Sequence, residues 1–359
     1  MEHKPKILIV RLSAIGDVIH SLPVLHALRR KFPNAYIGWL VEDKAAEILL
    51  GNSLIDQVYV LPKKKWKSQG FTLKTCKEFL EFIKTIKNEK FDIAIDLQEL
   101  FKSGILTYLS GAKRRIAHAK TREFADIFIN EKLKAHNIFD PNKPVIERYL
   151  ETAQHLEAPT DEIKFSLPPI NQQIKDTVSG LLKNLDKDKP IVILAPATTW
   201  PSKHWLESYW SELLDRLAPD NNVIFIGSSQ DIALINKITS EANTDNYLSL
   251  AGKTSLLELI ELFNRTDIVI APDTGPAYIA NATDKPAIIM ISGSTSYKRT
   301  FPYGEKHTAI AANLPCQPCH KKRCLKKDYH MECMKKVTPD KIFRIFNEKL
   351  TLIGKNIVL

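Results

Sequence analysis

The chain has 359 residues, of which 44% are hydrophobic and 26% charged, and its formal net charge is +10 at pH 7. This length exceeds one ordinary core and favours two domains, while the basic excess predicts an anionic partner: nucleic acid, nucleotide phosphates or an acidic membrane surface. No apolar run approaches the roughly 18 residues of a membrane span, and the polar start lacks the layout of a signal peptide. We therefore expect a cytoplasmic protein.

Short apolar runs alternate with segments of helical period along the first part of the chain. The predicted strands are 7–12, 35–41 and 91–97, and the predicted helices are 18–32, 77–88 and 145–156. This alternation is typical of a parallel sheet covered by helices on both faces. The polar, proline-bearing stretch at 157–173 then predicts a domain junction.

The same alternation restarts in the second part of the chain. The predicted strands are 190–196, 222–227, 267–273 and 285–292, and the predicted helices are 205–217, 256–265 and 338–350. The chain is therefore predicted to be an α/β protein with two doubly wound domains and a cleft between them. The predicted parts are an N-terminal domain (1–165), a linker (166–187), a C-terminal domain (188–336), and a C-terminal segment (337–359) whose helix packs back on the domain interface.

The first strand-to-helix turn lies in "ILIVRLSAIGDVIH", residues 7–20. A dinucleotide site would show three glycines here, spaced G-x-G-x-x-G, but only Gly16 is present, so an NAD enzyme is not expected. Asp17 follows where the helix begins. In isolation it is either a helix-capping group or a catalytic carboxylate placed beyond the end of a strand.

Two later turns have the composition of anion sites. In "PATTWPSKHW" (196–205), Thr198 and Thr199 can donate to phosphate oxygens and Lys203 supplies a positive charge. In "APDTGPAYIANA" (271–282), Asp273 ends a strand and Gly275 allows a tight turn into a helix N-terminus. An ordinary capped loop with a solvated lysine is the alternative for the first turn. Together the two turns predict a nucleotide-diphosphate site.

Four ordered segments carry a family resemblance: "RLSAIGDVIHSLPVLHALRRKFP", "IDLQELFKSG", "PATTWPSKHW" and "PDTGPAYIA". They resemble the bacterial ADP-heptose:lipopolysaccharide heptosyltransferases of glycosyltransferase family nine, most of all the type I enzymes that add the first heptose. The likeness spans nearly the whole chain. It implies a GT-B architecture of two Rossmann-like domains, with the acceptor bound by the N-terminal domain and the nucleotide sugar by the C-terminal domain.

The resemblance also implies roles for single residues. Asp17 matches the proposed general base, and Lys203 is expected to act on the leaving diphosphate. The predicted donor contacts are Thr198, Thr199, Lys203, Asp231, Thr254, Asp273, Thr274, Gly275 and Tyr278. The predicted acceptor contacts are Ser13, Gly16, Lys102 and Arg115. For Asp231, a carboxylate stabilising the first turn of a helix is the alternative to a ribose contact.

The chain departs from the family pattern at three places. Tyr278 replaces a histidine, "GSTSYKR" (293–299) replaces Gly-Pro-Thr-Asp-Pro, and Glu99 replaces a glycine. A phenol at position 278 is a neutral group where the family has a potential cationic donor to phosphate. An altered sugar or weakened activity would be consistent with these changes.

Two basic segments lie in the predicted acceptor domain, "KKKWK" (63–67) and "AKRRIAHAKTRE" (112–123). They either form a solvated surface or attract a Kdo–lipid A acceptor at the inner membrane face. In the second case each Lys or Arg near the membrane surface adds about 1 kcal/mol to the binding free energy. The second interpretation predicts a peripheral protein on an anionic inner-membrane surface.

Four of the five cysteines are clustered with the spacing C-x2-C-x4-C-x8-C, at Cys316, Cys319, Cys324 and Cys333. Four thiolates at such spacing could hold a structural Zn or Fe. Four reduced thiols in a basic loop are the alternative. No cofactor is predicted to be required for catalysis, because Lys203 and two helix N-termini can supply positive charge to the leaving diphosphate.

The predicted function is therefore inverting transfer of heptose from ADP-heptose to the Kdo region of the lipopolysaccharide inner core. The first alternative is a family-nine glycosyltransferase with another nucleotide sugar or a protein acceptor. The second is a basic nucleic-acid-binding protein with a zinc knuckle. That alternative predicts aromatic residues among the basic ones, and Trp66 is the only one within the two segments, so no nucleic-acid partner is expected.

Overall fold

The structure is a computed structural model that describes residues 4–70, 72–135, 137 and 140–354. The chain forms two compact units, Met1–Pro169 and Ile170–Leu359, each built on a six-stranded parallel sheet. This confirms the predicted α/β class. In the described part of the chain, no helix combines the length and apolar character needed to cross a bilayer.

The sheet of the first unit has the strand order β3-β2-β1-β4-β5-β6. Its strands are β1 (Lys6–Val10), β2 (Tyr36–Glu42), β3 (Gln57–Leu61), β4 (Ile93–Asp96), β5 (Arg114–His118) and β6 (Glu131–Leu133). Its helices are α1 (Ile15–Lys31), α2 (Asp43–Ala46), α3 (Lys63–Gln69), α4 (Leu73–Asn88), α5 (Phe101–Leu109), the 3₁₀ helix η1 (Arg122–Phe128) and α6 (Val145–Gln154). The central strand β1 is a continuous apolar run because helices cover both faces of the sheet.

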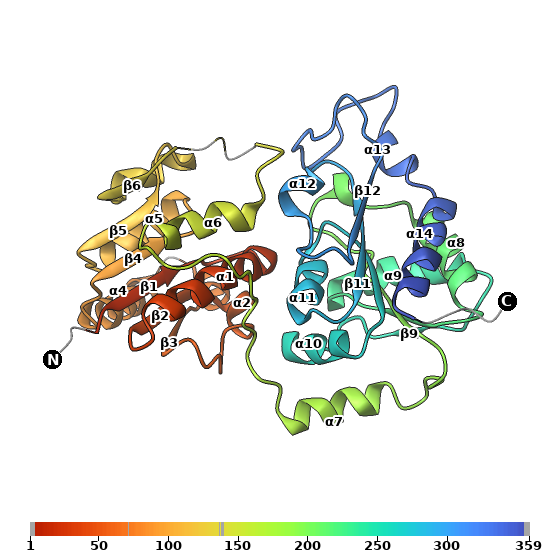
Figure 1. The fold of residues 1–359 in the computed structure, drawn as a ribbon, viewed down its shortest axis with the longest axis horizontal. Helices are drawn as coiled ribbons and strands as arrows, with labels where there is room; N and C mark the ends of the chain where they lie inside the picture. The colour runs from red at the N-terminus through yellow and green to blue at the C-terminus, as the bar shows by residue number, and fades with distance from the viewer. Residues whose placement is uncertain (1–3, 71, 136, 138–139, 355–359) are drawn as a thin grey trace. The chain divides into compact units, whose positions relative to one another are not determined.

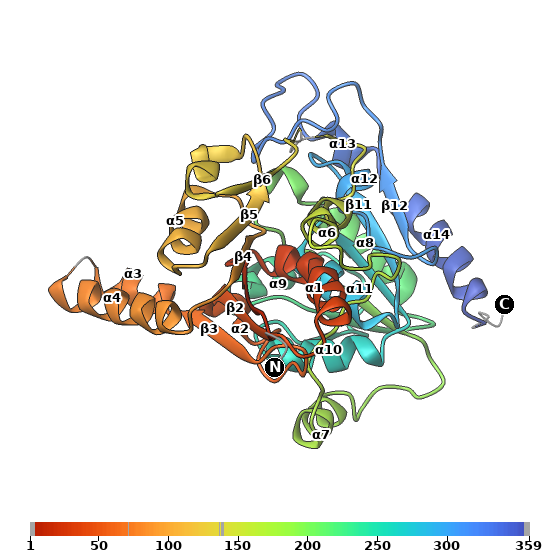
Figure 2. The same ribbon diagram turned by 60° about the vertical axis from the view of Figure 1, so that its left-hand side comes forward.

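The helices of the first unit form two layers, one on each face of the sheet (Figures 1 and 2). Ile83 and Ile86 of α4 and Leu106 of α5 pack in one cluster with side chains of β1, β2 and β4. On the other face α1 packs against α6. The short helix η1 packs on α5, so α4, α5 and η1 belong to one side of this unit.

The sheet of the second unit has the strand order β12-β11-β10-β7-β8-β9. Its strands are β7 (Ile191–Leu194), β8 (Asn222–Phe225), β9 (Leu248–Ser249), β10 (Ile268–Pro272), β11 (Ala287–Ser292) and β12 (Thr308–Ala311). Its helices are α7 (Gln172–Leu181), the 3₁₀ helix η2 (Pro201–Lys203), α8 (Glu207–Leu217), the 3₁₀ helix η3 (Ser229–Asp231), α9 (Ile232–Ser240), α10 (Leu256–Asn264), α11 (Gly275–Thr283), α12 (Tyr297–Thr300), α13 (Glu332–Lys335) and α14 (Pro339–Leu352).

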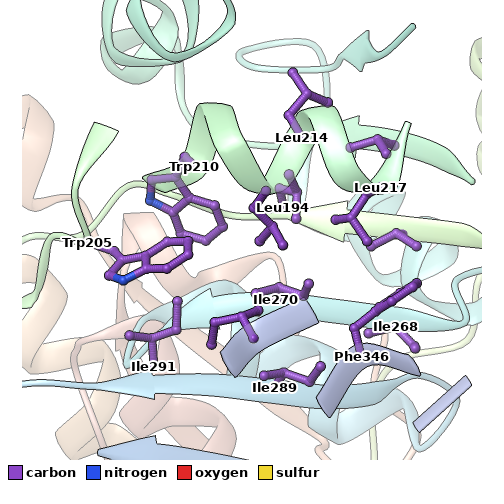
Figure 3. Close-up of a cluster of buried hydrophobic side chains, with 14 of the residues drawn as sticks. Leu194, Trp205, Trp210, Leu214, Leu217, Ile268, Ile270, Ile289, Ile291 and Phe346 are labelled. Atoms are coloured by element: carbon purple, nitrogen blue, oxygen red, sulfur yellow. The ribbon is translucent and has the colours of Figure 1, made fainter. Parts of the chain in front are cut away.

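Buried aromatic side chains pack in the core of the second unit, between the sheet and its helices (Figure 3). The rings of Trp205 and Trp210 meet edge to face with centroids 4.9 Å apart, an arrangement that adds to the stability gained from burial. Phe346 of α14 packs in the same core as Ile268 and Ile289. This cluster anchors the loop that follows β7, because that loop leads directly to Trp205.

The structure adds detail to two of the predicted parts. In the predicted C-terminal segment, Ile342, Phe346 and Leu350 of α14 lie in the core of the second unit, where α14 contacts α8. Apolar side chains at that spacing form one face of a helix, and this face is buried by the nearest sheet. The segment predicted as a linker contains α7, which packs on α10.

Candidate active site

The turn between β1 and α1 brings Arg11 and Asp17 together. Nη2 of Arg11 lies 2.9 Å from Oδ2 of Asp17, and the same carboxylate oxygen accepts the backbone N–H of Ala14 at 3.3 Å. The side chain of Arg11 is 5% exposed and that of Asp17 is 43% exposed. Asp17 is therefore both a capping group of α1 and a carboxylate open to solvent, held by a buried cation.

Arg11 was not predicted as a site residue. Its Nη1 donates to the carbonyl of Leu97, and its guanidinium carbon lies 5.0 Å from the ring centroid of Tyr149. Burial by itself lowers the pKa of Arg11, but the carboxylate of Asp17 and other nearby groups raise it above its usual value. The side chain is therefore charged. The signal in the sequence is a cation directly after a buried apolar strand.

The loop after β4 holds the loop after β1 in place. Oε1 of Gln98 accepts the backbone N–H groups of Leu12 and Ser13, at 2.8 and 3.2 Å. Asp96 in turn fixes the Gln98 loop by accepting the N–H groups of Gln98 and Glu99, at 2.9 and 3.0 Å. Complete burial raises the pKa of Asp96 to about 7. Hydrogen bonds through Gln98 thus join the loops that follow the adjacent strands β1 and β4.

Ser13 and Lys102, two predicted acceptor contacts, lie together at this edge of the sheet. Nζ of Lys102 is 3.4 Å from the Ser13 hydroxyl and 2.8 Å from a carboxylate oxygen of Glu42 at the end of β2. Nζ of Lys63 also contacts Glu42, at 3.0 Å. Glu42 is buried. It was not predicted as a site residue, because its contacts depend on which strands are neighbours.

The other two predicted acceptor residues have different surroundings. Gly16 is buried in the first turn of α1. Arg115 lies near the start of β5 and donates to the backbone carbonyls of Phe128 and Ala112, at 2.8 and 2.9 Å. Its guanidinium carbon lies 5.3 Å from the ring centroid of Tyr108. The structure therefore does not group Arg115 with Ser13 and Lys102.

Glu99 belongs to a buried charged network in the first unit. One carboxylate oxygen lies 2.5 Å from Nδ1 of His118, and the other accepts from Arg148 of α6. Nε2 of His118 lies 3.1 Å from Glu151, also on α6. Burial lowers the pKa of His118, although Glu151 opposes the change. The residue that replaces the family's glycine therefore connects the ends of β4 and β5 to α6.

In the second unit, Lys203 and Asp273 form an ion pair at the carboxyl ends of β7 and β10. Nζ of Lys203 lies 2.8 Å from Oδ2 of Asp273, and both side chains are largely buried. Burial by itself raises the pKa of Asp273, but the Lys203 ammonium and three side-chain hydrogen bonds hold it below its usual value. The pair fixes a cation next to the N-terminus of α11.

Tyr278 and Thr295 complete the surroundings of Asp273. The Tyr278 hydroxyl donates to Oδ1 and the Thr295 hydroxyl donates to Oδ2. Thr295 lies in the segment after β11 where the chain departs from the family pattern, and it was not predicted as a site residue. The phenol that replaces the family's histidine therefore acts on the carboxylate that orients Lys203.

The remaining predicted residues of the two anion turns lie at the same edge of this sheet. The Thr198 hydroxyl donates to the carbonyl of Trp200 at 2.8 Å, and that of Thr274 donates to the carbonyl of Ala197 at 3.3 Å. Thr199 is exposed. Gly275 is the first residue of α11, and Pro276 follows it. The first backbone N–H groups of a helix have no partner within the helix and can bind an anion.

Asp231 and Thr254 follow the neighbouring strands β8 and β9. Oδ2 of Asp231 accepts both the backbone N–H and the hydroxyl of Ser228 at 2.7 Å. This is the helix-stabilising role that was the alternative to a ribose contact. Thr254 precedes Ser255, the N-cap of α10. The loops after β8 and β9 meet where the N–H of Gly252 donates to the carbonyl of Gly227 at 2.8 Å.

The loop that contains the cysteines is fastened to the Lys203 loop. The Ser202 hydroxyl donates to the carbonyl of Lys321 at 2.6 Å and lies 2.8 Å from the Ser294 hydroxyl. The Ser202 N–H donates to the carbonyl of Lys322 at 3.1 Å. These bonds place the backbone of the cysteine loop against the residue that precedes Lys203.

The four clustered cysteines are half-buried thiols that form no disulfide in the structure. Burial, reinforced by the three neighbouring thiols, raises the pKa of Cys333 to about 11. Among the residues that the structure describes, no three His, Cys, Asp or Glu side chains are grouped so that they could hold a metal ion.

The chain is similar to known proteins in both sequence and fold. The family model described as "Glycosyltransferase family 9 (heptosyltransferase)" matches residues 79–330. The chain is 28% identical over 312 residues to the lipopolysaccharide core heptosyltransferase OpsX of Haemophilus influenzae, covering 84% of this chain and 83% of that protein. It is 27% identical over 322 residues to lipopolysaccharide heptosyltransferase 1 of Pseudomonas aeruginosa, covering 89% and 87%.

A solved structure shares the fold over almost the whole chain. The E. coli heptosyltransferase WaaC with ADP superimposes with a TM-score of 0.74 at 21% identity, covering 96% of this chain and 99% of that one. The same protein is known with ADP-2-deoxy-2-fluoro heptose. The two sheet-based units are thus those of the GT-B fold. By its sequence and its architecture, the chain belongs to glycosyltransferase family 9, the heptosyltransferase family, and is an enzyme.

Proposed function

We propose that this enzyme transfers heptose from ADP-heptose to the Kdo region of the lipopolysaccharide inner core, with inversion at the anomeric carbon. The observation that carries the donor assignment is the buried Lys203–Asp273 ion pair beside the N-terminus of α11. A fixed ammonium and a helix N-terminus are both suited to a diphosphate. The names of the relatives and the ADP complexes of WaaC support the same choice of donor and product class.

In this proposal Asp17 is the general base. Its carboxylate takes the proton of the acceptor hydroxyl as that oxygen forms a bond to the anomeric carbon of heptose. Because Arg11 is charged and almost completely buried, its ion pair holds the carboxylate in a fixed orientation. The partial exposure of Asp17 leaves the carboxylate open to an acceptor.

In the same step, the bond between the anomeric carbon and the diphosphate oxygen breaks, and ADP leaves with an added negative charge. Lys203 stabilises that charge, and Asp273 holds the ammonium in position. Thr198, Thr199, Thr274 and Gly275 contribute hydroxyls or backbone N–H groups to the diphosphate. Asp231 and Thr254 are proposed at the nucleoside end of the donor. The positive charge of Lys203 and of the N-terminus of α11 takes the place of a divalent metal in this proposed step.

We assign the acceptor to the first unit. Ser13, Gly16 and Lys102 line the turn that carries Asp17, and the ammonium of Lys102 suits the carboxylate or phosphate groups of a Kdo–lipid A acceptor. Arg115 is proposed to contribute through the basic surface near β5. Because this acceptor is anchored in lipid, we propose that the enzyme works in the cytoplasm, peripherally on the inner face of the inner membrane.

A structural Zn or Fe at Cys316, Cys319, Cys324 and Cys333 remains a separate proposal. The thiols are close enough to affect one another electrostatically, but metal binding would require them to approach more closely than the structure places them. Metal analysis of the purified protein tests this: about one metal per chain, lost in Cys316→Ser/Cys319→Ser, would support the site. Four titratable thiols and no metal would support reduced cysteines instead.

The reaction is tested by incubating the enzyme with ADP-heptose and Kdo2–lipid A and following the acceptor by mass spectrometry, with and without a chelator. We expect a mass gain of one heptose that is insensitive to the chelator and lost in Asp17→Asn. Asp161→Asn, which breaks a surface ion pair with Arg30, is the matched control and should retain the rate. Binding of ADP-heptose without transfer would contradict the acceptor, and no binding would contradict the donor.

A further inference from the structure

Large apolar side chains are exposed on one side of the first unit. Leu73 is 92% exposed and Phe124 is 77% exposed. The exposed large hydrophobic residues of this unit, as far as the structure describes it, are Leu73 and Leu80 of α4, Phe101 and Tyr108 of α5, Phe124 and Ile127 of η1, and Leu50. All but Leu50 therefore belong to three adjacent elements. We call the surface of α3, α4, α5 and η1 the α4–α5 face.

The α4–α5 face is one continuous layer. Helices α4 and α5 contact each other and cover the same side of the sheet, and η1 packs on α5, where the rings of Phe101 and Phe128 lie 5.3 Å apart. The basic helix α3 is held on α4 by Trp66, whose ring meets Phe79 at 5.8 Å. Figure 2 shows α3 and α4 extending outward from the sheet, with α5 beside them.

The outward side of α4 mixes apolar and basic residues at helical spacing. Leu73, Lys77, Leu80 and Lys84 follow one another at intervals of three or four and are all exposed, while Ile83 and Ile86 point to the core. A helix that needed only to cover the sheet would place polar residues at these outward positions. The two leucines therefore leave most of their apolar surface open to solvent.

The α4–α5 face carries an excess of positive charge. Residues 63–87 contain eight lysines and two glutamates, residues 101–122 contain six Lys or Arg and no acidic residue, and the rest of η1 adds Glu123 and Asp126. Exposed apolar side chains surrounded by basic ones are typical of surfaces that lie in the interface of an anionic bilayer, where the apolar groups enter the acyl boundary and the cations meet the headgroups. A second copy of this face would be repelled by its like charge.

We infer that the α4–α5 face is a membrane-docking surface whose partner is an anionic phospholipid bilayer. Leu73, Leu80, Phe124 and Ile127 insert into the bilayer boundary, and the surrounding lysines bind lipid phosphates. The inference rests on the proposed function in one respect: Phe101 of this face is followed directly by Lys102, which contacts Ser13. Docking through α5 would therefore hold the proposed acceptor half-site close to a lipid-anchored acceptor.

The test is cosedimentation of the whole protein with vesicles of phosphatidylcholine containing 30% phosphatidylglycerol, or with phosphatidylcholine alone. We expect binding to the anionic vesicles and a loss of about 100-fold or more in the variant Leu73→Ser/Leu80→Ser/Phe124→Ser/Ile127→Ser, since each buried leucine side chain contributes about tenfold or more. The matched control removes exposed leucines elsewhere, Leu50→Ser/Leu325→Ser/Leu352→Ser, and should bind within about twofold of the native chain.

A charge variant separates headgroup attraction from insertion. Lys74→Gln/Lys77→Gln/Lys84→Gln should weaken binding to anionic vesicles roughly tenfold or more, whereas Lys183→Gln/Lys187→Gln/Lys335→Gln, on the second unit, should not. Equal vesicle binding by the native chain and the four-serine variant would overturn the inference. So would a native dimer that the four-serine variant dissociates without any change in vesicle binding, because the face would then join two copies.

The failure of this inference can be told apart from failure of the proposed reaction. With Kdo2–lipid A dispersed in detergent, the four-serine variant should transfer heptose at the native rate, because none of the four residues is a proposed substrate contact. With the same acceptor in anionic vesicles, its rate should fall in parallel with binding. If no acceptor is glycosylated but vesicle binding still depends on the four residues, the docking surface stands and the reaction assignment falls.

Discussion

The guanidinium of Arg11 and the carboxylate of Asp17 form an ion pair, with Nη2 2.9 Å from Oδ2, in which the cation is buried and the anion is half exposed. A buried cation is costly without a partner, so the structure needs Asp17 where it is. Arg11 in turn positions Asp17, because the guanidinium is itself held by the carbonyl of Leu97 and the ring of Tyr149. The pair orients a carboxylate that solvent or substrate can reach.

We therefore predict that Arg11→Met lowers kcat by about 10- to 100-fold while the affinity for ADP changes little. Arg11→Lys should recover part of the rate, since it restores the charge without the fork of donors. Steady-state kinetics and titration calorimetry with ADP measure the two quantities. Arg30→Met, which removes a surface ion pair between α1 and Asp161, is the control and should leave kcat unchanged.

Because Lys203 and Asp273 form an ion pair, we expect substitution of either residue to lower kcat/KM through the same interaction. Lys203→Met should lower kcat/KM about 100-fold or more, because the charge on the leaving diphosphate loses its fixed cation. Asp273→Asn should have a comparable effect by releasing the ammonium. Titration calorimetry with ADP and steady-state kinetics measure both, and Lys183→Met is the surface control. Fully additive losses in the double variant would contradict the view that the two residues act as a unit.

We expect removal of the Tyr278 hydroxyl to lower the stability of the protein but to change its affinity for ADP little. Tyr278→Phe removes the hydrogen bond to Asp273 and should lower the free energy of unfolding by about 1 to 3 kcal/mol, because a buried acceptor loses a partner. The affinity for ADP should change by less than about threefold. Tyr278→His introduces the residue typical of the family. A large gain in ADP affinity for Tyr278→His alone would show that the phenol limits donor binding.

His307 predicts a loss of stability in acid. Its ring is buried, Nε2 lies 3.0 Å from the amide nitrogen of Asn281, and burial lowers the pKa of His307 to about 4. The pKa in the unfolded chain is about 6.5, so between these values the unfolded chain binds a proton that the folded chain does not. The contribution to stability is present above about pH 6.5 and is lost as the pH falls toward 4.

Urea unfolding followed by tryptophan fluorescence measures this effect. Between pH 7 and pH 5 the native chain should lose about 2 kcal/mol that His307→Gln does not lose, since glutamine can accept the Asn281 hydrogen bond but does not titrate. Other titrating groups are common to both proteins and cancel in the comparison. The same pH dependence in both chains would assign the acid loss to other residues.

The sequence predicts the strands that are mostly apolar and misses the short or polar ones. The strands β1, β4, β7 and β10 form the centre of each sheet and are mostly apolar. The edge strands β3, β6, β9 and β12 and the strand β5 were not predicted, because they are short or contain charged or polar residues: β5 is "RRIAH", β6 is "EKL" and β9 is "LS". Edge strands are buried on fewer sides, so their sequences show less of the hydrophobic pattern.

The same distinction applies to the site. Asp17, Lys203 and Asp273 follow apolar strands, and the sequence alone places them beyond strand ends. Glu42 and Thr295 were not predicted as partners, because each contacts a residue from a different strand end. Arg11 lies in the same turn as Asp17, but a buried cation after a strand does not show by itself which carboxylate it pairs with. Which strand ends are neighbours is set by the strand order of the sheet, which hydrophobic patterns do not encode. The sequence therefore predicts the reactive groups better than the groups that hold them.

Because Ser202 is hydrogen-bonded to the cysteine loop, cleavage of that loop by a protease should depend on whether the donor half-site is occupied. Lys321, Lys322 and Arg323 are exposed, while the carbonyls of Lys321 and Lys322 hold Ser202, next to Lys203. A nick by trypsin at this point would release the Lys203 loop without touching any proposed substrate contact. Conversely, a nucleotide that immobilises Lys203 should slow the cut, so the rate of cleavage there reports occupancy of the donor half-site without any measurement of turnover.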